Sequence, residues 1–216
     1  MRWVGYANVL AWAAIAPASA QVPLEAMPLG TAPQKTYSEC VTDPEPYLAL
    51  SFEAFDQGVQ PIADGPRRES GWREVARQEG CETAGADLIS QWRERHGASL
   101  HPSRQSFLAF HEGQLRAGGG DHASAIPLIE AGRVNFSDAA GEAYVDAVLA
   151  FLRSDRGALL DARDRLLAVP EPPNWPEMQR AFKEQADQEM EWPMNIEATE
   201  VLVRCFGEPY PVFAEC

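Results

Sequence analysis

The chain has 216 residues, of which 45% are hydrophobic, and a formal net charge of −14 at pH 7. This length suits one solid core or a short stack of helical units, and the hydrophobic content suits a folded protein. The acidic charge repels nucleic-acid phosphates and anionic lipid, so it argues against nucleic-acid partners.

The first twenty residues have the three parts of a secretory signal peptide. Arg2 supplies the positive start, residues 9–16 form an apolar run, and Ala18-Ser19-Ala20 is the small-residue pattern that signal peptidase reads. We expect cleavage between Ala20 and Gln21, which leaves a mature chain of charge −15 because Arg2 is lost. The apolar run is shorter than the ~20 residues of a membrane span, and no cysteine follows the cleavage point to carry a lipid. These features predict a periplasmic or secreted protein.

Residues 21–40 contain three prolines and a glycine without an apolar period, which predicts a flexible tether before a single helical domain over residues 41–216. Apolar residues then recur at helical spacing, and alternating β patterns with hairpin dipeptides are absent. The first expected helix covers about residues 46–57. Later helices are expected to begin after Ser70, Cys81, His101, Asp121, Asp138, Asp155, Pro176 and Asn195. The pattern predicts an all-α fold of about nine helices.

Four cysteines, Cys40, Cys81, Cys205 and Cys216, suggest two disulfides in an oxidising compartment. Three pairings are possible. We favour the local pairing Cys40–Cys81 and Cys205–Cys216, because Gly207, Pro209 and Pro211 would let the chain turn back between the last two. The rival pairing joins the two ends of the chain. Because no CxxC occurs, neither a thioredoxin-type redox role nor a zinc ribbon has support.

Residues 102–169 contain an internal repeat with a period of 34 residues. The aligned pairs are Phe110 with Tyr144, Leu115 with Leu149, Asp121 with Asp155, and Ile126 with Leu160. Each block has the order helix, short turn ending in Asp, helix. In the first block, small or apolar residues stand at Gly113, Gly120, Ala125, Ile126, Ile129 and Gly132. This part of the chain resembles the tetratricopeptide family of stacked antiparallel helical hairpins, in which small residues allow close helix packing.

The second block departs from the family pattern at Ser154, Leu159 and Arg163, and two units are fewer than a stable stack usually contains. The flanking helices would therefore have to cap the stack. In the family, the first helices of successive units line a face that binds peptides or proteins. The resemblance implies that the partner-binding residues are Phe110, Gln114, Tyr144, Val148 and Phe151. It implies a non-catalytic binding or envelope-scaffold protein.

No catalytic, cofactor-binding or metal-binding motif stands out. His111-Glu112 begins like the zinc-protease helix motif, but Leu115 stands where the second histidine should be. The other histidines, His96, His101 and His122, fit loop and cap positions. The alternative function is a small periplasmic hydrolase of cell-wall glycan or peptide, with an acidic residue in a helical cleft. No motif selects one Glu or Asp for that role.

Overall fold

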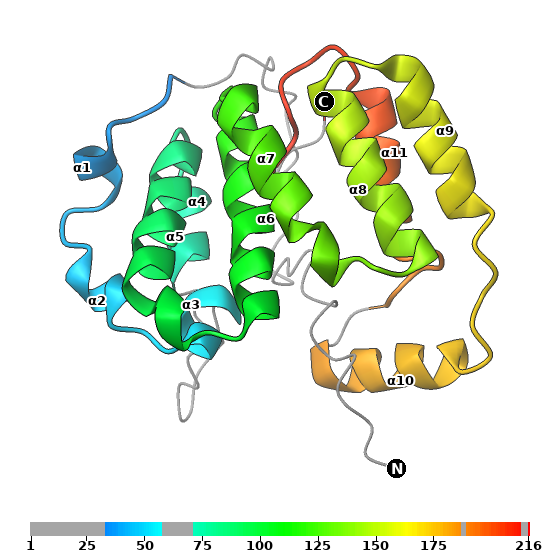
Figure 1. Ribbon diagram of the computed structural model, residues 1–216, viewed down its shortest axis with the longest axis horizontal. Coiled ribbons are helices and arrows are strands. Elements are labelled where there is room, and N and C mark those ends of the chain that lie inside the picture. The colour runs from blue at the N-terminus through cyan, green and yellow to red at the C-terminus, as the bar shows by residue number, and fades with distance from the viewer. Residues whose placement is uncertain (1–32, 58–70, 187–188, 213–215) are drawn as a thin grey trace, which may run out of the picture.

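The computed structural model describes residues 33–57, 71–186, 189–212 and 216, and its regular elements in these ranges are helices (Figure 1). Eleven α-helices and two short 3-10 helices are present there, against the nine or so expected, and no strand is. The all-α prediction is confirmed. The signal peptide and residues 21–32 of the tether lie outside the described residues. The helices are α1 (Tyr37–Cys40), α2 (Glu45–Leu48), α3 (Phe52–Gln57), α4 (Trp72–Ala76), α5 (Glu82–His96), η1 (Gly97–Ser99), α6 (Pro102–Gly118), α7 (His122–Gly132), η2 (Arg133–Asn135), α8 (Ala139–Leu152), α9 (Arg156–Leu167), α10 (Trp175–Ala186) and α11 (Ile196–Arg204).

Three helix starts follow the predicted aspartates, and each carboxylate caps its helix. The side-chain acceptors and backbone N–H donors are Asp121 and Ser124 at 3.0 Å, Asp138 and Gly141 at 2.7 Å, and Asp155 and Ala158 at 2.9 Å. Each bond satisfies a backbone N–H that has no partner inside the helix. Local capping chemistry therefore places α7, α8 and α9 where the sequence predicted them.

The N-terminal part differs from the prediction in two places. The expected helix over residues 46–57 is split into α2 and α3, because backbone carbonyls near the break are bonded to side chains of α5. The Leu50 carbonyl accepts from the Trp92 indole at 3.2 Å, and the Leu48 carbonyl lies 2.8 Å from the His96 ring.

The predicted tether also ends too late. Residues 33–40 include α1, and the Lys35 N–H donates to the Gly80 carbonyl at 2.8 Å. The Gln34 side chain bonds both Glu82 and Thr83 at the start of α5. These contacts and the neighbouring disulfide hold the segment against α5.

Both predicted disulfides are present. Cys40 pairs with Cys81, and Cys205 pairs with Cys216, with Cα–Cα distances of 5.8 Å and 5.4 Å. The first joins α1 to the start of α5. The second joins the end of α11 to residue 216, so it closes a loop that contains the segment after α11.

The longest helix, α6, lies between two apolar core clusters. One face of α6 packs on α4 and α5 in the N-terminal half (Figure 1). Its other face packs on α7, and its side chains there share a core with α8. Leu108 and Leu115 belong to the N-terminal cluster, whereas Phe107 and Phe110 belong to the C-terminal cluster with α8, α9 and α11. The middle of the molecule is therefore built on α6.

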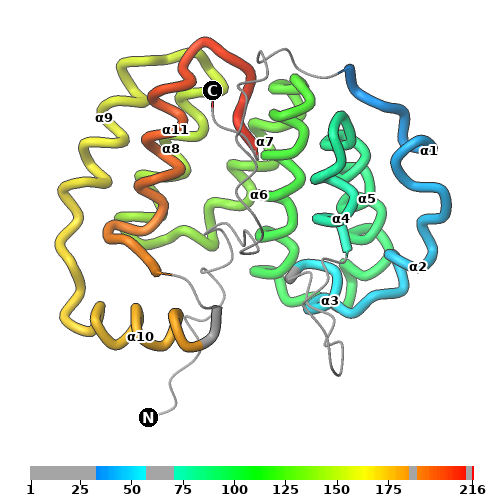
Figure 2. Tube along the Cα trace, turned by 180° about the vertical axis from the view of Figure 1, so that it is seen from behind, coloured from blue at the N-terminus to red at the C-terminus, as the bar shows by residue number. Residues whose placement is uncertain are grey.

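α10 lies apart from these two clusters, at the edge of the molecule below α8 and α9 in both views (Figures 1 and 2). It has a small apolar cluster of its own, built on Trp175, Phe182 and Met190. The Trp192 indole joins this unit to the end of α9 by donating to the Val169 carbonyl at 3.0 Å. No helix within the described ranges is both long and apolar enough to cross a bilayer.

Candidate functional site

The five predicted partner-binding residues come together in one place. Phe110 and Gln114 lie on α6, and Tyr144, Val148 and Phe151 lie on α8. We call these five side chains the α6–α8 face. All five side chains are buried, and Tyr144, the most exposed of the five residues, has only 5% of its surface exposed. The five side chains thus lie together, and other parts of the same chain bury them.

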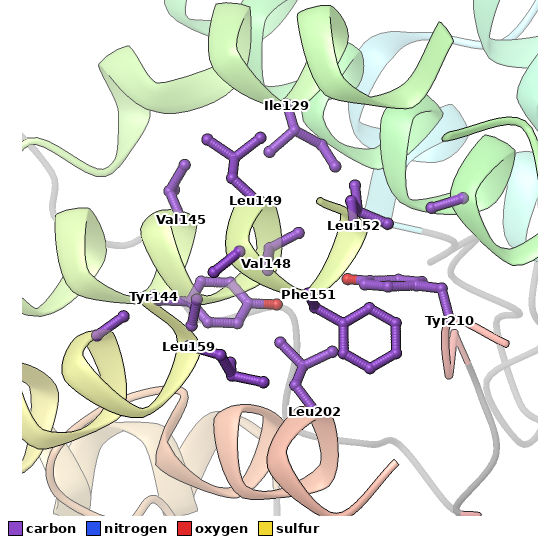
Figure 3. Packing of buried hydrophobic residues seen from close by; sticks show 14 of the residues in the cluster. Ile129, Tyr144, Val145, Val148, Leu149, Phe151, Leu152, Leu159, Leu202 and Tyr210 are labelled. Atoms are coloured by element: carbon purple, nitrogen blue, oxygen red, sulfur yellow. The ribbon is translucent and has the colours of Figure 1, made fainter. Parts of the chain in front are cut away.

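One cover is α11, and the other is the segment that follows it. Leu202 of α11 lies close to Phe151 in Figure 3, and Phe206 meets the Phe151 ring edge-on with centroids 6.1 Å apart. After α11 the chain crosses toward α6, as the red trace shows from both sides (Figures 1 and 2). We call residues 206–212 the C-terminal segment.

Tyr210 anchors the C-terminal segment on the α6–α8 face. Its ring is 6% exposed and packs edge-on against Phe151, with centroids 5.6 Å apart. Its hydroxyl points toward that of Tyr144 (Figure 3). Farther along, Val212 lies so close to α6 that a Cβ on Gly118 would be 2.2 Å from Val212 Cγ2. The lack of a side chain at Gly118 therefore leaves the space that Val212 occupies.

Gln114 is the polar centre of the face. Its amide Nε2 donates to the hydroxyls of Tyr144 and Tyr210, each at 3.2 Å. Burial raises the pKa of Tyr144 to about 12, and burial with the nearby Tyr144 raises the pKa of Tyr210 well above its usual value. Both phenols therefore stay protonated at physiological pH. The Gln114 amide therefore gives each buried hydroxyl a hydrogen-bond partner.

His111 continues this polar chain on the other side of Gln114. Its Nδ1 lies 3.4 Å from Gln114 Oε1, and because an amide oxygen only accepts, Nδ1 is the donor. The ring packs between Trp72, at 5.3 Å, and Phe107, at 4.4 Å. Burial first, and then the charge of Arg73, lower the pKa of His111 well below its usual value. The imidazole is therefore neutral in the fold.

Asp56 forms a second buried polar group next to Trp72. Its Oδ1 accepts from the Trp72 indole at 3.4 Å and lies 3.6 Å from Arg73 Nη1. Burial raises the pKa of Asp56, and the opposite charge of Arg73 works against that shift. The guanidinium also lies over the Trp72 ring, 4.0 Å from its centroid. Arg73 thus lies between the buried Asp56 carboxylate and the Trp72 ring that packs on His111.

Glu112, the acidic neighbour of His111 in the sequence, faces α5. It bonds Arg93 of α5 through one oxygen and Arg116, one turn along α6, through the other at 2.8 Å. Arg116 also reaches Asp87 at 3.2 Å. The buried Glu112 carboxylate therefore links α5 to α6 through these ion pairs.

The remaining histidines make local hydrogen bonds or ring contacts, or lie at helix starts. The His101 ring accepts from the Ser103 N–H at the start of α6, and His96 stacks on Trp92 with centroids 4.3 Å apart. His122 is the first residue of α7. Among the residues that the structure describes, no three His, Cys, Asp or Glu side chains gather closely enough to hold a metal ion.

Tyr210, Asp56 and the role of His111 beside Gln114 were not predicted from the sequence. The one available signal for Tyr210 was its place between Pro209 and Pro211, which marks an extended segment. The comparisons of this chain with protein-family models, with curated proteins and with solved structures found no match.

Proposed function

We propose that this chain is an exported, non-catalytic helical-hairpin protein that binds an extended peptide, or an extended part of a protein, on its α6–α8 face. The observation that carries the proposal is that such a segment already lies there. Residues 206–212 pack on the face through Tyr210, whose ring and hydroxyl both have partners. A surface that accommodates one extended segment has the shape and the polar groups for another.

The packing of α6 on α7 supports the tetratricopeptide-like part of the proposal. An added Cβ on Gly113 would lie 2.7 Å from Ile129 Cγ1, and one on Gly132 would lie 2.6 Å from Phe110 Cβ. The two helices therefore approach closely at Gly113 and Gly132, where the family keeps small residues. α8 packs on α9 in the same way that α6 packs on α7, as a pair of neighbours in the chain.

The compartment is part of the proposal. Two disulfides use all four cysteines, and structural disulfides persist in oxidising compartments. Together with the signal-peptide pattern of residues 1–20, they support a periplasmic or secreted location.

The test is an unbiased selection of random twelve-residue peptides on the folded chain from Gln21, with disulfides formed. Two baits are compared, wild type and Tyr210→Ala, in which the segment loses its anchor. We expect peptides that the variant retains and wild type retains poorly. Tyr144 and Phe151 are left unchanged because they form the face itself, and far-UV circular dichroism first checks that Tyr210→Ala, which truncates an equally buried ring, is folded. If neither bait enriches any peptide, the proposed function is overturned.

The second candidate is the hydrolase, and the perturbed groups around Trp72 favour it. A buried acid with a raised pKa and a buried neutral imidazole are the kind of groups that active sites use. Asp56→Asn and His111→Gln variants, assayed with wild type on cell-wall glycan and peptide fragments, test it. Hydrolysis by wild type that both variants lose would replace the binding proposal.

A further inference from the structure

We infer that the ligand of the α6–α8 face is an extended peptide with a tyrosine flanked by prolines, and that the C-terminal segment is an internal copy of that ligand. This inference rests on the proposed function and names its ligand class. In the bound state, the peptide would replace Tyr210 between Gln114 and Phe151.

The chemistry of the C-terminal segment defines the ligand. Residues 206–212 read Phe-Gly-Glu-Pro-Tyr-Pro-Val. Pro209 and Pro211 fix φ near −65° and push the residue before each of them into an extended conformation. The prolines therefore favour an extended conformation for residues 208–211 before binding, which reduces the loss of conformational entropy, whereas Gly207, with a φ of 97°, lies in the turn that follows α11.

The segment is held by its side chains. Among the described residues, the backbone bonds outside helices include one from the Glu208 N–H to the Cys205 carbonyl, and none to residues 209–212. Phe206, Tyr210 and Val212 make the contacts, while Glu208 and Pro209 are exposed. Prolines supply no N–H at two positions, so recognition depends on an aromatic surface with a polar group at its centre, as in other proline-rich peptide sites.

The Cys205–Cys216 disulfide makes the segment an effective competitor. It joins Cys205, at the end of α11, to Cys216, eleven positions later, and so closes a short loop. A short closed tether of this kind gives an effective concentration on the order of millimolar. An outside peptide must therefore compete with a segment that is always close by, and opening the loop should favour the outside peptide.

The test is fluorescence anisotropy with a labelled synthetic peptide of residues 206–212, blocked at both ends. It is titrated with the folded chain from Gln21 as oxidised wild type and as Tyr210→Ala. We expect the variant to bind about tenfold more tightly than wild type, because only wild type must first release its own segment. A control peptide with alanine in place of the tyrosine should not bind. Adding Gln114→Leu to Tyr210→Ala should weaken binding about 2–10-fold, since one hydrogen bond is lost.

A second variant covers the case in which Tyr210→Ala does not fold. Cys205→Ser with Cys216→Ser keeps the tyrosine but opens the loop, and it should bind the peptide more tightly than oxidised wild type. Equal affinity for the peptide and its alanine control, or equal affinity of wild type and the folded variants, would overturn the inference. If the random selection instead yields peptides without an aromatic residue next to proline, the proposed function stands and this inference falls.

Discussion

Replacing Gly113 by alanine should destabilise the chain, although alanine is the better helix former. Gly113 lies within α6 on the side that packs against α7. An alanine Cβ there would lie 2.7 Å from Ile129 Cγ1, 3.0 Å from the Ala125 carbonyl oxygen and 3.2 Å from the Ile129 nitrogen. Ordinary van der Waals contact begins at 3.4 Å, and two of these atoms belong to backbone that a rotamer change cannot move.

Two opposing effects set the magnitude. Overpacking a core site costs about 1–3 kcal/mol, and backbone neighbours place this site in the upper half of that range. Alanine in a helix interior gains about 0.8–1.0 kcal/mol over glycine. We therefore expect Gly113→Ala to lower the free energy of unfolding by about 1–2 kcal/mol.

The matched control is Gly157→Ala in α9. The nearest atom to a Cβ at Gly157 is Asp155 Oδ1 at 3.5 Å, which is ordinary contact. Gly157 is the second residue of α9, where the helix preference of alanine over glycine is smaller than in a helix interior, so this variant should be as stable as wild type or slightly more stable. Urea unfolding with intact disulfides, followed by far-UV circular dichroism and tryptophan fluorescence, measures both. If Gly113→Ala proves as stable as Gly157→Ala, then α6 and α7 do not pack as closely as we describe.

Three further predictions concern a cap, a turn and a buried base. Asp155→Ala should lower the free energy of unfolding in urea by about 1 kcal/mol, because the Ala158 N–H at the start of α9 loses its acceptor; an unchanged midpoint would contradict the cap assignment. Ser154 has a φ of 56°, so Ser154→Gly relieves about 1–2 kcal/mol of backbone strain. A more flexible unfolded chain offsets part of that relief, which leaves a gain of about 0.5–1 kcal/mol, and a lower melting temperature would contradict it. The pKa of His111 in the folded chain is lowered from 6.5. As the pH falls, the unfolded chain therefore binds a proton at this histidine before the folded chain does. The free energy of unfolding should thus be unaffected by His111 above pH 6.5 and should decline below it. The decline is at most about 1.4 kcal/mol per pH unit, and His111→Gln should reduce it when unfolding is compared at pH 7.5 and 5.5; an unchanged slope would show that another group causes it.

Much of the helix layout could be predicted because it depends on neighbours in the chain. The carboxylates of Asp121, Asp138 and Asp155 act on N–H groups three residues away. Both disulfides join cysteines that follow each other in the sequence. Such features are visible as spacing, and the structure confirms them.

The features that the sequence did not show depend on contacts between distant residues. The break between α2 and α3 reflects the Trp92 indole, which is 42 positions away from the Leu50 carbonyl. The hydrogen bond from Gln114 to Tyr210 spans 96 positions. Helical spacing placed Tyr144 and Phe151 on one stripe, but it carried no information about which segment would cover that stripe.

The position of α6 between two core clusters has a consequence for hydrogen exchange. If the N-terminal cluster opens alone, Phe107 and Phe110 still hold α6 to α8, and if the C-terminal cluster opens alone, Leu108 and Leu115 hold it to α5. The amides of α6 should therefore exchange only when the whole molecule unfolds, whereas those of α10, with its own small cluster, should exchange through local opening. Partial unfolding would thus leave α6 as the last ordered element of the chain.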